Sequence, residues 1–159
     1  MNEQEKNQYL ELLNFLAEAE SSIAELYEAC SQVWKIDAPF WLEIVQEERK
    51  HTAAIKQIQN IISSSPEQFT SNEPFKPIAL QTFIHMIKEI LKKVNNGQLT
   101  RDNILSIARD IEQSVIETKY NRFVKTDNSE YNQLVEQIVT ETHMHKDLFT
   151  QKLEEVKKK

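Results

Sequence analysis

The chain has 159 residues, a formal net charge of −6 and one cysteine, Cys30. This length predicts a single domain with a sizeable core, and the lone cysteine excludes an internal disulfide or a Cys-x-x-Cys metal knuckle. The acidic balance argues against a nucleic-acid binder. Without a long apolar run or a secretory-type leader, we expect no membrane association and a cytoplasmic location.

Composition predicts an all-α fold. One glycine and four prolines leave little of the turn chemistry that hairpins need. The chain is instead rich in Glu, Gln, Lys, Leu, Ile and Ala, most of which are strong helix formers. We therefore expect one helical domain over residues 1–159.

The first helix is expected from residue 2 or 3 to about residue 34. Its inward stripe alternates steps of four and three residues, which is typical of a helix in a bundle. One carboxylate interrupts this otherwise apolar stripe, whose members are Tyr9, Leu13, Leu16, Glu20, Ile23, Tyr27 and Cys30. Asp37 is placed to cap the next helix, and Pro39 suits its first turn.

The second helix is expected to end near residues 63–66. Its stripe has the same spacing and contains Trp41, Ile44, Glu48, His51, Ile55, Ile58 and Ile62. Residues 63–77 hold three of the four prolines and predict a long connection. A shorter amphipathic helix over 78–94 follows, and Gly97 suits a left-handed cap at its end.

The next helix is expected to start after Thr100 and to run to about Val124. Its stripe contains Leu105, Ala108, Glu112 and Val115. A tight turn is expected over 125–129, and the last helix then carries Val135, Ile138, Thr142, His145, Phe149 and Leu153. The four long helices would form two hairpin-like pairs, with the shorter helix in the link between them.

Two segments of the chain resemble each other. IVQEERKH (44–51) and IVTETHMH (138–145) both begin Ile-Val, have Glu in fourth place and end in His. ESSIAELY from Glu20 also aligns with EQSVIETK from Glu112. Most of the candidate polar residues therefore recur in both pairs, but Thr142 stands where the first pair has Glu48.

Polar residues at core positions point to a metal site. An ionised glutamate in an apolar core is costly unless a counter-charge is near. The stripes contain three glutamates and two histidines at such positions: Glu20, Glu48, Glu112, His51 and His145. A divalent metal would satisfy them, because the two residues of a Glu-x-x-His motif share one helix face. If the stripes are rotated, these glutamates face water instead. For the two histidines the alternative is an ordinary core residue whose hydrogen bonds are satisfied.

This ordered set resembles the ferritin-like superfamily and, within it, the rubrerythrin-like branch, over about residues 8–150. The resemblance implies a ferritin-like four-helix bundle with an extra helix in the connection. It implies two iron ions, or manganese: Glu20 and His51 would serve one, Glu112 and His145 the other, and Glu48 would bridge them. It also implies reaction with dioxygen or peroxide, as in an oxidoreductase or peroxidase, with an external electron donor.

The pattern departs from that branch at Thr142, where a second bridging glutamate is expected. Three carboxylates and two divalent ions leave a charge of +1, which is costly in a core. Glu141 could take the missing place, one metal alone could bind, or the site could be empty. In an empty site at least one carboxylate should hold a proton near neutral pH. Val115 also replaces a further rubrerythrin glutamate and no rubredoxin domain is seen, so peroxidase activity cannot simply be carried over.

Two more residues are expected near the ligands. Tyr27 would hydrogen-bond a ligand or pack in the core, and Thr142 would hydrogen-bond a metal-bound water or mark a degenerate site. No catalytic residue is assigned. The alternative function is a degenerate bundle without catalysis that serves as a binding or structural module, or metal storage or delivery. A homodimer is left open.

Overall fold

The computed structural model describes residues 1–74, 76–117 and 122–159 and is an all-α bundle, as the composition predicts. It contains five helices in the described ranges: α1 (Glu3–Val33), α2 (Ala38–Ser64), α3 (Pro77–Asn95), α4 (Arg101–Glu117) and α5 (Ser129–Lys157). Two short 3₁₀ turns, η1 (Lys35–Asp37) and η2 (Pro66–Gln68), and two short strands, β1 (Phe69–Ser71) and β2 (Val124–Thr126), complete the described elements.

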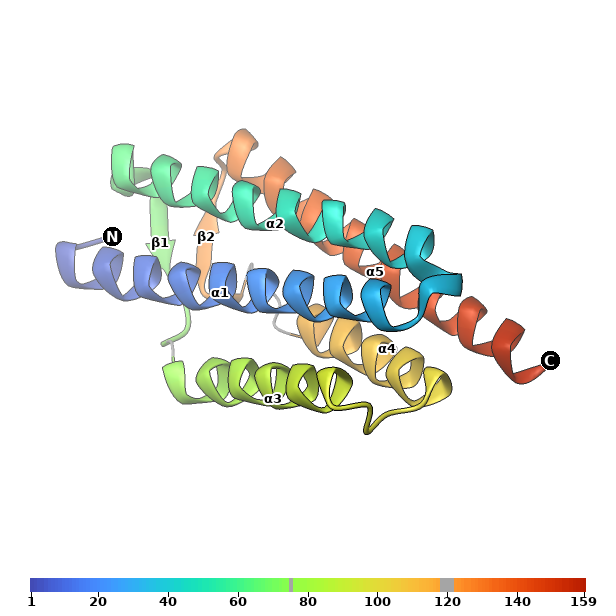
Figure 1. The fold of residues 1–159 in the computed structure, drawn as a ribbon. Helices are drawn as coiled ribbons and strands as arrows, with labels where there is room; N and C mark the ends of the chain where they lie inside the picture. The colour runs from blue at the N-terminus through green and yellow to red at the C-terminus, as the bar shows by residue number, and fades with distance from the viewer. Residues whose placement is uncertain (75, 118–121) are drawn as a thin grey trace.

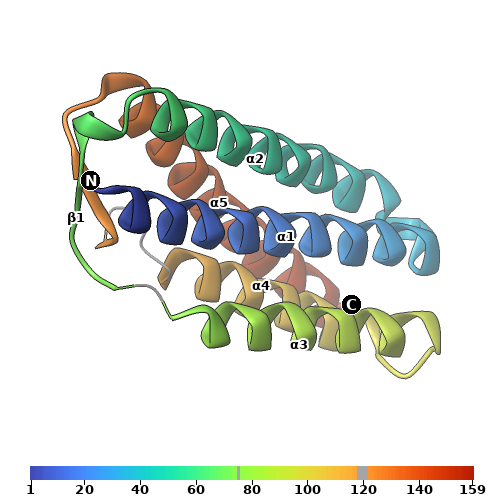
Figure 2. The same ribbon diagram turned by 90° about the vertical axis from the view of Figure 1, so that its left-hand side faces the viewer.

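Four of the helices form the bundle and the fifth lies in the link, as predicted. Helix α1 packs antiparallel to α2, and α4 packs antiparallel to α5 (Figure 1). Helix α3, in the connection between the pairs, runs alongside α1 on the side away from α2 in both views (Figures 1 and 2). The connection carries the chain from the end of α2 to the opposite end of the bundle, where α4 begins. Helices α2 and α4 therefore run in the same direction.

The ends of the first two helices follow from local chemistry. Asn2 Oδ1 accepts a hydrogen bond from the Glu5 backbone N–H at 2.9 Å, and Glu5 returns one to the Asn2 N–H at 2.8 Å, which makes a capping box. Asp37 occupies the cap position of α2, and Pro39 lies in its first turn. The Asp37 carboxylate does not cap α2, however, because it accepts two hydrogen bonds of 2.6 Å from Arg101.

The turn between α3 and α4 is also as predicted. Gly97 has a φ of 67°, in the left-handed region that favours glycine. Thr100 Oγ1 accepts a hydrogen bond from the Asn103 backbone N–H at 3.2 Å and so caps the start of α4.

The predicted end of the fourth helix near Val124 is wrong. The described part of α4 ends at Glu117, residues 118–121 of the predicted helix lie outside the described residues, and Val124 begins β2. Strand β2 pairs antiparallel with β1, with Phe69 opposite Thr126 and Val124 opposite Ser71. Val124 continues the apolar pattern of the predicted helix. The backbone of residues 124–126 nevertheless pairs with residues 69–71, which are far away in the sequence. The predicted turn over 125–129 is therefore partly strand, and Asn128 caps α5.

The core is divided along the bundle axis into two apolar clusters. One contains, among others, Ile23, Tyr27, Trp41, Ile44, Leu105, Ala108, Phe149 and Leu153. The other contains, among others, Leu13, Leu16, Ile55, Ile58, Phe69, Val124, Tyr131 and Ile138. Between these clusters, at the same level of all four bundle helices, lie the predicted polar residues.

No helix in the described ranges combines the length and the apolar character needed to cross a bilayer.

Candidate metal site

All four bundle helices contribute a side chain to the polar layer. Glu20 comes from α1, Glu48 and His51 from α2, Glu112 from α4, and His145 from α5. Each is at most 2% exposed. The helix faces predicted from the sequence to be buried are therefore buried, and the side chains of these five residues point inward.

Glu20, Glu48 and His51 form the first group. Their ligand atoms lie within 4.8 Å of one another. His51 Nδ1 is 3.5 Å from Glu48 Oε2 and 4.0 Å from Glu20 Oε2. The three side chains could hold one metal ion.

Glu48, Glu112 and His145 form the second group, again with ligand atoms within 4.8 Å. His145 Nδ1 is 2.7 Å from Glu48 Oε1 and 3.7 Å from Glu112 Oε2. Glu48 belongs to both groups, and its two oxygens face different imidazoles. This is the arrangement that a carboxylate bridging two metals requires.

Several ligand atoms are buried without a hydrogen bond. Among the described residues, Glu48 Oε1, His51 Nδ1 and His145 Nδ1 have no hydrogen-bond partner. His145 Nδ1 lies close to Glu48 Oε1, but the two atoms are not aligned for a hydrogen bond. Buried polar atoms are normally satisfied. Atoms that converge on a common point without bonding to one another are typical of ligands for a cation.

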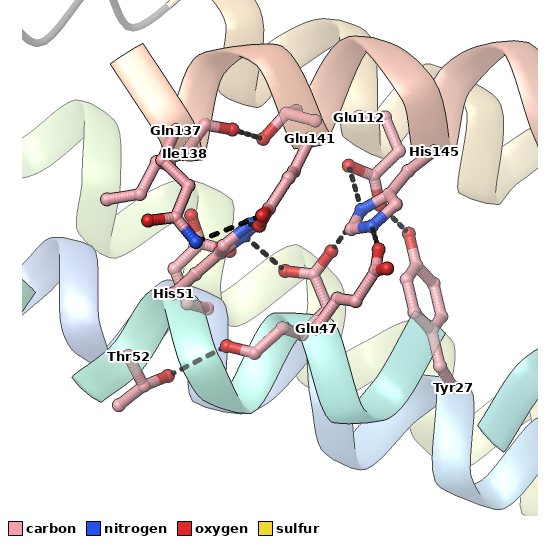
Figure 3. Close-up of polar contacts among 12 residues, drawn as sticks. Tyr27, Glu47, His51, Thr52, Glu112, Gln137, Ile138, Glu141 and His145 are labelled. Carbon is pink, nitrogen blue, oxygen red and sulfur yellow. Dashed lines mark hydrogen bonds and ion pairs between the residues drawn. The ribbon is translucent and has the colours of Figure 1, made fainter. Parts of the chain in front are cut away.

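The outer nitrogens of the two imidazoles also have carboxylate partners. His51 Nε2 is 2.7 Å from Glu141 Oε2, and His145 Nε2 contacts Glu47 Oε2 (Figure 3). The other oxygen of Glu141 accepts a hydrogen bond from Gln137 at 3.0 Å. The two imidazole rings lie stacked, with centroids 5.6 Å apart.

Tyr27 satisfies both roles that the sequence left open. Its hydroxyl donates a 2.6 Å hydrogen bond to Glu112 Oε1 (Figure 3). Its ring packs on Trp41 and Phe149. Burial and the nearby carboxylates raise the pKa of Tyr27, so the hydroxyl keeps its proton and acts as a donor. Glu112 is thus held with one oxygen on Tyr27 and the other toward His145.

Thr142 is buried in the polar layer, but its hydroxyl points back along its own helix. Thr142 Oγ1 donates a 2.7 Å hydrogen bond to the Ile138 carbonyl oxygen. Its only hydrogen-bond donor is therefore used within α5. Glu141, the predicted replacement ligand, lies on the outer nitrogen of His51, and it belongs to neither of the two groups that could hold a metal ion.

Protons supply the counter-charge in the metal-free protein. Burial and the charge of Glu48 raise the pKa of Glu112 to about 7, so one carboxylate does hold a proton near neutrality. Burial would lower the pKa of His145, but Glu112 and Glu48 outweigh it and raise that pKa to about 11. Burial would raise the pKa of Glu48, but His145 and His51 outweigh it and lower that pKa. A metal ion would compete with these protons for the same atoms.

Glu47 is the residue that the sequence analysis missed. It lies beside the inward stripe rather than in it, so the pattern of buried positions does not single it out. The signal was nevertheless present, because Glu47 and Glu141 are the shared fourth residues of the two similar segments. A glutamate repeated at equivalent places in both halves indicates a shared role.

Fold and site together define an all-α helical bundle in which buried glutamates and histidines could hold a metal ion. Comparison with protein-family models, curated proteins and solved structures finds no match. The resemblance to the rubrerythrin-like branch therefore rests on the residues alone, and we take up its functional implications as a proposal.

Proposed function

We propose that this protein is a two-metal carboxylate protein that uses iron or manganese to react with dioxygen or peroxide. The observation that carries the proposal is the pair of buried groups joined by Glu48. Carboxylates and Glu-x-x-His motifs that project from four helices toward one level are the pattern of di-iron carboxylate bundles.

The ligand types favour these metals over softer ones. Neither group contains a thiolate, and each combines two carboxylates with one imidazole. Carboxylates suit manganese and imidazole suits iron, whereas Cu(I) prefers sulfur. When bound, iron or manganese ions in such a site supply the electrons that reduce dioxygen or peroxide.

The surroundings prepare the ligands for this chemistry. Glu48 lies between the two imidazoles, so each of its oxygens can serve one ion. Tyr27 orients Glu112 so that Oε2 faces His145. The apolar clusters on either side keep water out and strengthen every charge interaction in the layer.

The inner layer lacks a carboxylate on the side of Thr142. Two divalent ions with three carboxylates carry a charge of +1, and the Thr142 hydroxyl is engaged with Ile138. A small anion from solution is the natural partner on that side. A thiol could serve as an internal source of electrons, but burial raises the pKa of the one cysteine, Cys30, and makes it unreactive. An external protein or small molecule would therefore supply the electrons.

The test is metal content combined with oxidant consumption. Protein purified from iron-fed cells should contain about two iron or manganese ions per chain by elemental analysis. After anaerobic loading with ferrous iron, it should consume added dioxygen or peroxide, whereas the metal-free protein should not. A fully folded protein that takes up no metal, with no change in melting temperature on added iron, would overturn the proposal.

Thr142 favours a second candidate, a bundle that binds metal without catalysis. A site with only one bridging carboxylate could keep its ions and leave oxidants unreduced. Metal uptake without oxidant consumption would support this binding or delivery role. Storage would require a hollow shell of many chains, which a measurement of particle size in solution would detect.

A further inference from the structure

Two glutamates outside both metal-holding groups each contact one imidazole on its outer nitrogen. Glu141 of α5 lies on Nε2 of His51, and Glu47 of α2 lies on Nε2 of His145. Each imidazole therefore contacts a glutamate that comes from a helix of the other pair (Figure 3). In both rings the opposite nitrogen, Nδ1, faces the buried carboxylates.

This contact decides which nitrogen can bind a metal. An ionised carboxylate only accepts hydrogen bonds, so the ring nitrogen facing it must carry a proton. A ring that ligates a metal has lost its second proton and keeps one N–H, and holding that N–H at Nε2 leaves the Nδ1 lone pair for the metal. Rotating the ring by half a turn would place a carbon against the carboxylate. Glu47 and Glu141 therefore select both the tautomer and the orientation of each ring.

Burial does not explain why these two glutamates lie there. The side chains of Glu141 and Glu47 are 25% and 36% exposed, whereas the imidazoles they contact are at most 1% exposed. Both carboxylates are exposed enough to reach water, yet both lie on an imidazole. The Nδ1 atoms on the far side of the rings have no hydrogen-bond partner among the described residues, as expected of atoms kept for a ligand.

We propose that Glu47 and Glu141 are positioning residues that prepare the two imidazoles for metal in a crossed arrangement. Glu141 acts on the ion held by Glu20 and His51, and Glu47 acts on the ion held by Glu112 and His145. The inference rests on the proposed two-metal site and deepens it. The outer carboxylates also bring negative charge toward a site that three inner carboxylates leave at +1.

The test measures zinc binding, which needs no redox activity. Glu47→Ala and Glu141→Ala are titrated with zinc against a competing chelator, beside Glu43→Ala and Glu136→Ala, which remove exposed glutamates from the same two helices. Loss of a residue that orients a metal-ligating histidine typically weakens binding by about 10–100-fold. Each positioning variant should show that loss at one of its two sites, and the controls should match wild type.

A second readout separates positioning from general stability. In zinc-loaded wild-type protein, the nitrogen NMR signals of His51 and His145 should show metal at Nδ1 and a proton at Nε2. Glu141→Ala should broaden or shift only the His51 pair, and Glu47→Ala only the His145 pair. Glu141→Gln and Glu47→Gln keep an oxygen acceptor and should recover part of the lost affinity, which loss of packing alone does not predict.

The outcomes distinguish this inference from the proposed function. If both alanine variants bind two zinc ions as tightly as the controls, or if zinc occupies Nε2 in wild type, the positioning role is wrong and the two-metal site stands. If the wild-type chain binds no metal at all, both proposals fail together.

Discussion

The two helix pairs supply the site unequally. Each pair places a glutamate on its first helix and a histidine on its second, and each lends an outer glutamate to the histidine of the other pair. The pair α1–α2 adds Glu48, whereas α4–α5 has Thr142 at the matching place. One carboxylate can link both groups because its two oxygens face different imidazoles.

The second pair also depends on the first for a hydrogen bond. Tyr27 of α1 reaches across the bundle to Glu112 of α4. The α4–α5 half of the site thus receives Glu48, Glu47 and Tyr27 from the other half. We infer that the α1–α2 half organises the layer, and the following changes test that asymmetry in order of expected effect.

Glu48→Ala should have the largest effect, because it removes the only residue common to both groups. For the proposed two-metal site we expect both metals to be lost, with affinity falling by more than about 100-fold, beyond the loss typical of residues that merely orient a ligand. Elemental analysis and chelator competition measure this loss. Glu43→Ala, on the exposed face of α2, is the control. Two ions retained by Glu48→Ala would show that Glu48 is not the bridge.

The α4–α5 half should dominate the pH dependence of the metal-free protein above pH 4.5. Glu112 has a pKa of about 7 when folded, above its ordinary value of 4.5, so the folded chain holds a proton that the unfolded chain releases. Its contribution is complete below pH 4.5 and is lost as the pH rises through 7. The shift corresponds to about 3 kcal/mol of unfolding free energy. The raised pKa of His145 adds a further loss that begins near its ordinary value of 6.5 and continues toward pH 11.

Urea unfolding of the metal-free protein between pH 5 and 8 measures this loss. Glu112→Gln keeps the shape of a protonated glutamate and cannot ionise, so it should flatten the dependence between pH 5 and about 6.5, above which the loss that belongs to His145 remains. A wild-type protein equally stable across that range, or a variant with the same slope, contradicts the assignment to Glu112.

Thr142→Glu should make the two halves more alike. A second bridging carboxylate brings the inner carboxylates to four, which balances the charge of two divalent ions, and we expect metal affinity to rise on the order of tenfold, or about 1.4 kcal/mol. The same carboxylate should destabilise the metal-free protein, because it is buried without a partner. Zinc titration and urea unfolding, each with and without metal, measure the two effects. An affinity that does not rise means that the geometry on the α5 side cannot accept a bridge.

Tyr27→Phe should have the smallest effect and should be confined to one half. It leaves Glu112 Oε1 without its 2.6 Å hydrogen bond, which should cost about 1 kcal/mol of stability. Zinc affinity should fall a few-fold at the Glu112 site only. Tyr131→Phe is the matched control, because it breaks the buried Tyr9–Tyr131 hydrogen bond of 2.7 Å in the other apolar cluster. Equal effects of the two variants on zinc binding would remove Tyr27 from the site.

Much of the fold could be predicted because helix signals are local. The alternating stripes placed Glu20, Glu48 and Glu112 correctly on buried faces, and Gly97 marked the end of α3. The predicted end of α4 was wrong because strand pairing is not a local signal. Val124 continues an apolar pattern, but its strand exists only through pairing with residues 69–71.

The sequence by itself determined that five ligand-type side chains lie on the buried faces of their helices, because periodicity along a helix sets which face each residue occupies. That they share one level of the bundle depends on how the helices align. The tertiary structure alone decided how those side chains meet. It placed Glu48 between two imidazoles, turned the Thr142 hydroxyl back to Ile138, and set Glu47 and Glu141 on the outer nitrogens. These outcomes depend on contacts between helices remote in the chain, where side-chain rotamers and charge compete in a buried space that no local pattern describes.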